Sequence, residues 1–429
     1  MQDHGYRRAR ARARCKTSFK TALGTRNDNF WHWFSIVGRA EGETSAWRLL
    51  ASYIGRRAVI ATAPDKRDGD QVPERLYLDH SATTPILPVA REAMNRGIDL
   101  WANASSPHGP GRAARAALEE ARDCVKRTLD WSGEVIFTSG ASEAIAMVLS
   151  RTQADALLVG ATEHDAVQRV AARAVVLPVG ADGLIQPHVL TGRLGALGAG
   201  LPLVVVQCAN SETGVLQPLG ELVNVVREAN GLLFADASQT AGKLPLPEVD
   251  MITVSAHKFG GPPGIGALLV RDLARLTATG GQERGYRSGT ENLPGALGMA
   301  AALAAPRGWV DRAADLRAHL DGAIEAAGGQ VVARSSPRIA TIASYRMPGV
   351  ASAAQLIQFD LAGIAVSAGS ACASGSLKPS HVLTAMGWRE AEAAEVVRVS
   401  FGPDTTRADV YRFVEVWRRL SADAKARAA

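Results

Sequence analysis

The clearest pattern in the sequence is a series of short apolar runs, often β-branched, separated by segments of helix length. Such runs are typical of buried strands, and their alternation with helices predicts an α/β fold: a mostly parallel sheet covered by helices on both faces. The runs are Val135–Phe137, Leu157–Val159, Val204–Val206, Leu232–Phe234, Ile252–Val254 and Leu268–Val270.

A helix is predicted over Ala113–Leu129, before the first of these runs. Its apolar positions recur at helical spacing and form one stripe, made of Ala114, Leu118, Ala121, Val125 and Leu129. Asp123 and Arg127 lie one turn apart on the opposite face, where such a pair stabilises a helix exposed to solvent.

Polar residues directly follow most of the apolar runs. They are Thr138-Ser139-Gly140, Glu163-His164, Asn210, Asp236 and Ser255 to Lys258. In sheets of this kind ligands bind beyond the carboxyl ends of the strands. We therefore expect five strand ends to converge on one site.

Lys258 has the chemistry of a coenzyme-binding residue. A lysine at the end of a buried strand is costly unless it reacts, and burial favours the neutral amine that a Schiff base requires. Asp236 could pair with a protonated pyridine nitrogen, and the turn from Thr138 to Glu143 could hold a phosphate. Taken singly, these residues could also be a surface lysine, a helix-capping aspartate and a capping box.

Together these motifs resemble the cysteine desulfurases, pyridoxal-phosphate enzymes of the class V aminotransferase group. The resemblance covers nearly all of the chain from Leu76 to about Ser421. It rests on seven segments in matching order: Tyr77–Pro85, Asn103–His108, Thr138–Glu143, Thr162–His164, Asp236–Gln239, Ser255–Gly260 and Arg287–Thr290.

The resemblance implies the fold of type I pyridoxal-phosphate enzymes and a division of the chain into three parts. Residues 86–315 would form the large coenzyme-binding domain, and residues 76–85 with 316–429 a smaller α/β domain. Residues 1–75 would be an extension, for which we expect disorder or a start codon assigned too far upstream. An Arg-rich transit peptide is the alternative.

The resemblance also implies roles for individual residues. Lys258 would carry the coenzyme, Asp236 would contact its pyridine nitrogen, and His164 would stack on its ring and move protons. Asn210 and Gln239 would contact the ring hydroxyl, and Asn103 and Arg398 the substrate carboxylate. The phosphate would be held by Ala141, Ser142, Ser255 and His257, with Thr290 reaching it from the neighbouring subunit of a homodimer.

Cys372 is the candidate sulfur acceptor. It stands in a Gly/Ser/Ala-rich run, Ser367 to Ser376, where a buried structural cysteine is not expected and a movable nucleophile is. The run resembles the desulfurases with the longer catalytic loop, although Ala368 replaces a serine of their pattern. Cys15, Cys124 and Cys208 match no functional position.

The charge is unevenly distributed along the chain. Residues 1–75 contain 15 Lys/Arg and 8 Asp/Glu, and since the whole chain carries +6, the remainder has a net charge of −1. No basic face is therefore expected on the main body, which argues against direct nucleic-acid binding.

The cysteines and the hydropathy indicate in which compartment the protein is expected. The four cysteines are widely spaced, without a CxxC pair or a zinc-like cluster, which favours a reducing, cytoplasmic setting and no metal site. No apolar run is long enough to span a membrane, and we expect no secretory signal.

The expected reaction converts L-cysteine to L-alanine and leaves the sulfur on Cys372 as a persulfide. Two kinds of acceptor protein are possible: an iron–sulfur scaffold or a tRNA-thiolation enzyme. The alternatives are a selenocysteine lyase, another pyridoxal-phosphate C–S lyase or aminotransferase-like enzyme, and a non-catalytic scaffold that retains the fold.

Overall fold

The computed structural model describes residues 75–198, 200–369 and 380–428. The predictions on the amino-terminal extension and on Cys372 lie outside these residues. Among the helices of the described ranges, none combines the length and apolar character needed to cross a bilayer.

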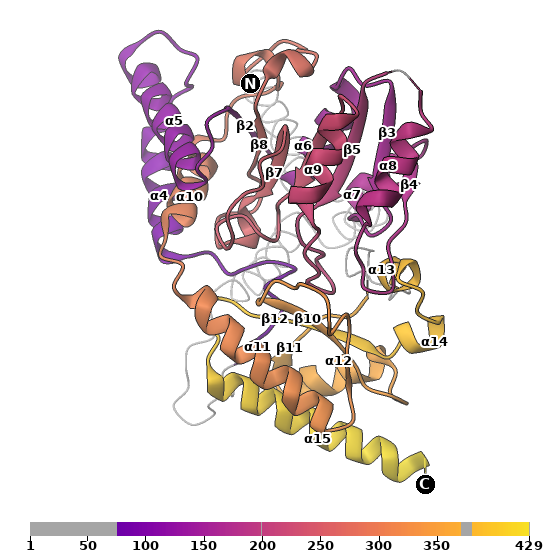
Figure 1. The fold of residues 1–429 in the computed structure, drawn as a ribbon. Helices are drawn as coiled ribbons and strands as arrows, with labels where there is room; N and C mark the ends of the chain where they lie inside the picture. Colours follow the sequence, from indigo (N-terminus) through magenta and orange to yellow (C-terminus); the bar gives the residue numbers. More distant parts are fainter. Residues whose placement is uncertain (1–74, 199, 370–379, 429) are drawn as a thin grey trace, which may run out of the picture. The chain divides into compact units, whose positions relative to one another are not determined.

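A seven-stranded sheet forms the centre of the larger part (Figure 1). Its strand order is β2-β8-β7-β6-β5-β3-β4, and only β8 runs antiparallel to its neighbours, so the sheet is mostly parallel as predicted. The strands are β2 (Glu134–Thr138), β3 (Ala156–Gly160), β4 (Val175–Leu177), β5 (Pro202–Gln207), β6 (Leu232–Asp236), β7 (Met251–Ser255) and β8 (Gly266–Val270). All six predicted strands are confirmed, and β4 was not predicted.

Alternate residues of the central strands belong to different hydrophobic clusters, because successive side chains of a strand point to opposite faces. In β5, Val204 and Val206 pack in one cluster, and Leu203 and Val205 in the other. The first cluster includes residues of α4 (Pro88–Leu100), α5 (Gly109–Thr128), α8 (Pro187–Gly195), α9 (Leu219–Glu228) and α10 (Leu293–Ala304). The second includes α6 (Ala141–Arg151) and α7 (Asp165–Gln168), so helices cover both faces.

Helix α5 begins four residues before the predicted start. His108 caps it, since its Nδ1 accepts a hydrogen bond from the Gly111 amide at 3.2 Å, and Pro110 occupies the first turn, where its missing N–H costs nothing. The five residues of the predicted apolar stripe are all buried, whereas Asp123 and Arg127 are exposed.

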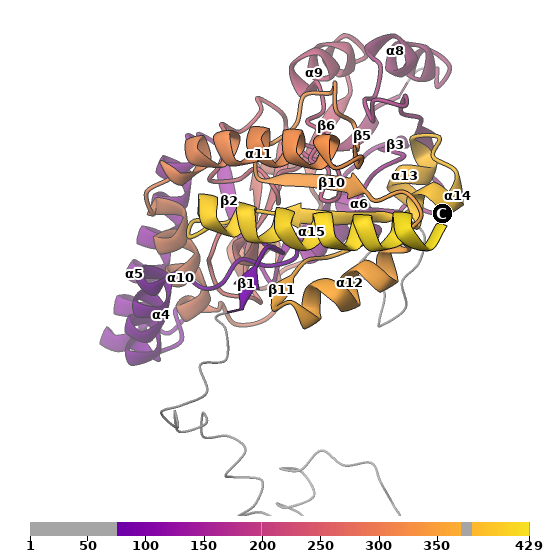
Figure 2. The same ribbon diagram turned by 90° about the horizontal axis from the view of Figure 1, so that it is seen from below.

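The smaller part contains two short sheets with helices packed against them (Figure 2). Strand β10 (Ile342–Arg346) pairs antiparallel with β9 (Gln330–Val331) and β12 (Val396–Ser400). Strand β1 (Leu76–Tyr77) pairs parallel with β11 (Ile364–Ala365). The helices are α11 (Trp309–Ala326), α12 (Ser352–Leu361), α13 (His381–Ala385), α14 (Glu390–Ala393) and α15 (Arg407–Ala428).

A separate hydrophobic core holds the smaller part together. It joins Leu76 and Leu78 near the start of the described chain to residues from Trp309 onward. The boundary predicted between residues 315 and 316 falls inside α11, whose Trp309 and Ala313 already pack in this core. We place the boundary before Trp309.

Candidate active site

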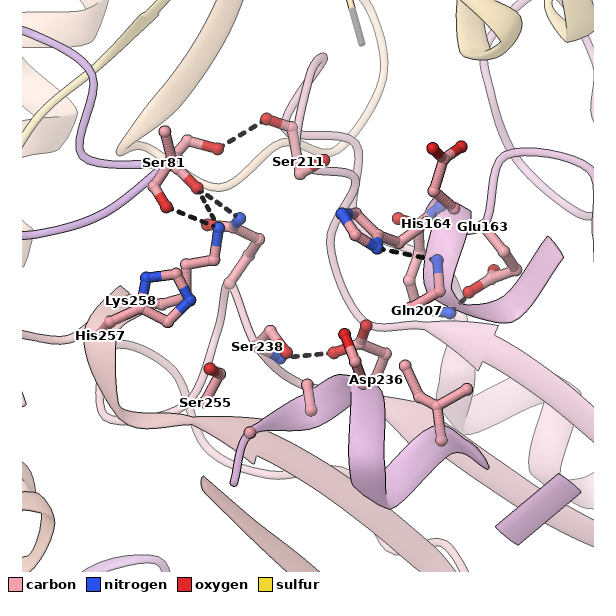
Figure 3. Close-up of a pocket in the computed structure, with 18 of the residues that line it drawn as sticks. Ser81, Glu163, His164, Gln207, Ser211, Asp236, Ser238, Ser255, His257 and Lys258 are labelled. Atoms are coloured by element: carbon pink, nitrogen blue, oxygen red, sulfur yellow. Dashed lines mark hydrogen bonds between the residues drawn. The ribbon is translucent and has the colours of Figure 1, made fainter. Parts of the chain in front are cut away.

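A pocket of about 510 Å³ lies at the carboxyl ends of the parallel strands. Figure 3 shows its polar lining. All five strand ends predicted to converge contribute lining residues, the β5 end through Gln207 and Ser211 and not through Asn210, and β12 of the smaller part adds Arg398. The predicted site residues that line the pocket are Ala141, Ser142, His164, Asp236, Gln239, Ser255, His257, Lys258 and Arg398.

Lys258 ends a single 3-10 turn, η1 (Ala256–Lys258), that directly follows β7. Its Nζ donates hydrogen bonds to the carbonyl oxygens of Ser81, at 2.6 Å, and Ala82, at 3.0 Å. Ser81 and Ala82 follow β1, so a segment distant in sequence positions the amine. The lysine is thereby directed at the pocket from the side of the smaller part.

His164 lies opposite Lys258 in the view of Figure 3. It caps helix α7, because its Nδ1 accepts a hydrogen bond from the Ala166 amide at 3.1 Å. The cap fixes the ring orientation and leaves Nε2 as the nitrogen that carries the proton in the neutral ring.

Asp236 is the last residue of β6 and lies on a third side of the pocket, beside Ser238 (Figure 3). Its Oδ1 accepts a hydrogen bond from the Ser238 amide at 2.8 Å, and the side chain is buried. A carboxylate in this position can serve as counter-ion to a protonated ring nitrogen.

Glu163 is a second buried carboxyl group next to Asp236. Its Oε1 accepts a hydrogen bond from the Gln207 amide at 3.0 Å, whereas no partner for Oε2 is found among the described residues. Burial, and then the charge of Asp236, raise the pKa of Glu163 well above its ordinary value. The Glu163 carboxyl group is therefore a weaker acid than an ordinary glutamate.

The amino-terminal end of α6 forms the anion-binding side of the pocket. Gly140 precedes the helix with φ +151°, a conformation that favours glycine, and no side chain caps the helix. The amides of Ala141 and Ser142 therefore stay available, with the positive end of the helix dipole behind them. Glu143 accepts a hydrogen bond from the Ser139 amide, so the predicted capping box is half formed.

His257 lies near this end of the pocket and approaches Thr83, with 3.2 Å between Nδ1 and Oγ1. Burial and the neighbouring Lys258 charge lower the pKa of His257 to about 4. The ring is therefore neutral at pH 7 and can offer one N–H without adding a fixed charge.

Arg398 lines the pocket and also forms a salt bridge. The distance between its Nη2 and the Asp79 Oδ1 is 2.6 Å. Its Nη1 donates to the Ser211 carbonyl at 3.1 Å, and its buried Nε has no partner among the described residues.

Asn210 and Asn103 do not line the pocket of the described chain. The Asn210 side chain is buried and occupied: its Oδ1 accepts from the amides of Glu212 and Thr213, and its Nδ2 donates to the Thr162 carbonyl. The contact of Asn210 with a ring hydroxyl stays a prediction, and in the described chain the side chain binds its own turn instead. Asn103 is exposed, and its Oδ1 accepts from the Ser105 amide at 2.8 Å.

Thr290 is exposed and also lies outside the pocket of its own chain. Its predicted action in a neighbouring subunit stays a prediction. Cys372 lies outside the described residues.

The pocket also contains residues that the sequence analysis did not single out. Gln207 ends β5, and its side chain donates a hydrogen bond to the Thr162 carbonyl. Its position, as a polar residue directly after an apolar run, could have indicated it as a site residue. Glu212 and His381 gave no comparable signal, because contacts distant in sequence bring them to the pocket.

The lining fits the phosphorylated pyridine coenzyme that the resemblance implies. The Gln239 Oε1 and Ser238 Oγ are buried in the pocket wall without partners among the described residues, as expected of atoms that bind a polar ligand. The uncapped α6 suits a phosphate, Asp236 a ring nitrogen, and Lys258 a covalent attachment.

The class-V aminotransferase family matches residues 76–413, and the chain belongs to this family. An IscS-like cysteine desulfurase of Mycobacterium tuberculosis is 37% identical over 372 residues, which are 79% of this chain and 94% of the relative. A cysteine desulfurase of Gluconacetobacter diazotrophicus is 35% identical over 370 residues, covering 80% and 92%.

Solved structures agree with these relatives. A NifS-like protein from Rickettsia africae superposes with a TM-score of 0.75 at 28% identity, covering 81% of this chain and 99% of that one. A structure described as SspA in complex with cysteine has a TM-score of 0.66 at 28% identity, covering 77% and 100%. Within its family the chain is thus a cysteine desulfurase that depends on pyridoxal phosphate. The lyase and scaffold alternatives are not favoured.

Proposed function

We propose that the pocket around Lys258 removes sulfur from L-cysteine and that Cys372 receives it as a persulfide. The observation that carries this proposal is the meeting of Lys258, Asp236 and His164 in one pocket with Arg398. These residues lie in or shortly after four different strands, and their side chains supply an amine, a carboxylate, an imidazole and a guanidinium.

The coenzyme would be held at three points. Lys258 would attach it covalently, Asp236 would pair with its ring nitrogen, and Gln239 would accept a hydrogen bond from its ring hydroxyl. The amides of Ala141 and Ser142, with Ser255 and His257, would hold its phosphate. When bound, the coenzyme supplies an electron sink for the charge that develops at the substrate Cα.

The substrate would bind through its carboxylate to Arg398, whose planar guanidinium can form two parallel hydrogen bonds. The Lys258 amine, directed by the Ser81 and Ala82 carbonyls, would take up the Cα proton. His164 would deliver or accept a second proton through Nε2, since Nδ1 is engaged in the α7 cap.

Sulfur transfer would follow as attack of the Cys372 thiolate on the substrate sulfur. A sulfur–sulfur bond forms, the carbon–sulfur bond breaks, and its electron pair stays on the carbon, which takes up a proton to yield L-alanine. Gly369 and His381, which precede and follow the segment containing Cys372, both line the pocket. This placement supports the choice of Cys372.

The proposal is tested by incubating the holoenzyme with L-cysteine and a reducing thiol and measuring sulfide and L-alanine together. Wild type should release both in equal amounts, and Cys372→Ser should release neither while retaining the coenzyme absorbance. Cys124→Ser, a matched change at a cysteine that does not line the pocket, should behave like wild type. Full activity of Cys372→Ser would refute the assignment.

Three further features belong to the proposal. The enzyme would act as a homodimer, with Thr290 reaching the phosphate of the neighbouring subunit. It would work in the cytoplasm. It would pass the persulfide sulfur by transient contact to an acceptor protein, either an iron–sulfur scaffold or a tRNA-thiolation enzyme.

A further inference from the structure

Two consecutive residues, Ser380 and His381, each bind a different loop of the pocket. The Ser380 Oγ donates a hydrogen bond to the Glu212 Oε2 at 2.5 Å, and the His381 Nε2 lies 3.0 Å from the Glu163 carbonyl oxygen. Glu212 follows β5 and Glu163 follows β3, so adjacent residues attach the chain to two strand ends of the large sheet.

The bond between Ser380 and Glu212 is buried at both ends, since Ser380 is 1% exposed and Glu212 7%. The Ser380 hydroxyl forms a second hydrogen bond, because it accepts from the Leu383 amide at 3.1 Å and so caps α13. The loop of Glu212 is held in turn: Ser344 donates to the Glu212 carbonyl at 2.8 Å. A charge-assisted hydrogen bond of this kind is among the stronger ones available.

The second bond reaches the residue that precedes His164. A carbonyl oxygen can only accept, so the His381 Nε2 is the donor, and this fixes the proton on Nε2 in the neutral ring. Because Glu163 and His164 are adjacent, the bond ties the position of His381 to the side of the pocket that presents the His164 ring.

The other end of the segment 370–379 is tied as well. Ser367 pairs with Arg398 through two backbone hydrogen bonds, of 3.2 Å from the Ser367 amide and 2.7 Å from the Arg398 amide. Cys372 lies five residues after Ser367 and eight before Ser380.

We propose that Ser380 and His381 are positioning residues for sulfur transfer, which fix the carboxyl-terminal end of the segment containing Cys372 relative to the Glu163–His164 and Glu212 loops. This inference rests on the proposed role of Cys372. It assigns the two residues no contact with substrate. Their bonds set the point from which the chain leads back to the acceptor cysteine.

His381 offers the cleaner test, because Ser380→Ala would also remove the α13 cap. His381→Ala removes the donor, and His381→Gln retains an N–H that can reach the Glu163 carbonyl. His188→Ala is the matched control, since His188 is exposed on α8 and does not line the pocket. In the loop that binds Ser380, Glu212→Ala removes the hydrogen-bond acceptor and Glu212→Gln retains one.

The experiment is a single turnover of the holoenzyme with L-cysteine in the absence of reducing thiol. The change in coenzyme absorbance on mixing reports substrate binding, and alkylation at timed intervals reports the persulfide. His381→Ala and Glu212→Ala should bind L-cysteine as wild type does but form the persulfide about 10- to 100-fold more slowly, the scale of a misplacement near 1 Å. His381→Gln and Glu212→Gln should recover most of the rate.

A wild-type persulfide rate in both alanine variants would overturn the inference. So would an equal loss of substrate binding and persulfide formation without recovery in the glutamine variants, because that pattern indicates general damage to the pocket. A wild type that forms no persulfide on Cys372 would contradict the proposed function itself, and with it this inference.

Discussion

The guanidinium of Arg398 is bound to the carboxylate of Asp79, with 2.6 Å between Nη2 and Oδ1. Asp79 follows β1 and Arg398 lies in β12, so the bond joins segments separated by most of the described chain. A second bond, from Nη1 to the Ser211 carbonyl, fixes the plane of the guanidinium. Asp79 therefore orients the group that we propose binds the substrate carboxylate.

Asp79→Ala should raise KM for L-cysteine with a smaller effect on kcat, because Arg398 loses the partner that orients it. Hydrogen bonds to charged groups contribute about 1.5–3 kcal/mol, which corresponds to about a 10- to 100-fold change. Asp79→Asn retains an acceptor oxygen, so its KM should lie between those of wild type and Asp79→Ala. Steady-state kinetics would show this, with Asp315→Ala as an exposed control; an unchanged KM in Asp79→Ala would contradict the orienting role.

Glu163→Gln should change the pH dependence of stability. The pKa of Glu163 is raised in the folded protein, so between the unfolded value of 4.5 and the folded value the native state binds the extra proton. The contribution of Glu163 to the stability of the wild type is therefore lost as pH rises through that window. Glutamine needs no proton, so the variant should gain stability relative to wild type with rising pH.

Denaturant unfolding of the two holoenzymes from pH 4 to pH 8 would measure this difference. A variant that is equally destabilised at every pH would show instead that the Glu163 carboxylate is ionised and needed as such.

Gly402→Ala should destabilise the protein, because a Cβ at this position would lie 2.0 Å from the Cε1 of the buried His80 ring. Overpacking of this kind costs about 1–3 kcal/mol. Since His80 precedes Ser81, whose carbonyl binds Lys258, coenzyme occupancy should fall too. Thermal unfolding and absorbance would test both effects. Gly220→Ala, where a Cβ meets nothing within 4 Å, is the control, and equal effects of the two changes would refute the argument.

Thr290→Ala should weaken coenzyme binding if Thr290 reaches the phosphate of a neighbouring subunit. The loss of one hydrogen bond, about 0.5–1.5 kcal/mol, corresponds to about a 2- to 10-fold rise in Kd. Light scattering should give the mass of two chains. Thr191→Ala, on the exposed side of α8, should leave Kd unchanged. A monomeric mass with full coenzyme affinity would contradict the dimer proposal.

The fold was largely predictable because its central strands are buried on both faces and so consist of continuous apolar residues, as in Val204–Val206. Strand β4 was not predicted, because it is only three residues long and lies at the edge of the sheet, where Val176 is 54% exposed. The direction of β8 was not predictable either, because an apolar run carries no information on whether its neighbour is parallel.

The site was predictable where a residue ends a strand, as Asp236 does, or lies in the turn directly after one, as Lys258 does. Prediction was limited where side chains turn back on their own loop or come from distant segments. Asn210 also follows a strand, but its side chain satisfies the amides of its own turn and leaves the pocket wall to Gln207 and Ser211. Glu212 and His381 reach the pocket wall through contacts with residues distant in sequence, Ser380 for Glu212 and Glu163 for His381, which spacing along the chain does not encode.

The most direct test of the account is the mass of the peptide that contains Cys372 after one turnover with L-cysteine and without reducing thiol. We predict that this peptide gains one sulfur atom, in an amount equal to the L-alanine formed, and that Lys258→Ala yields neither product. L-alanine formed with Cys372 unmodified, and the sulfur found as free sulfide or on Cys124, would contradict the central claim.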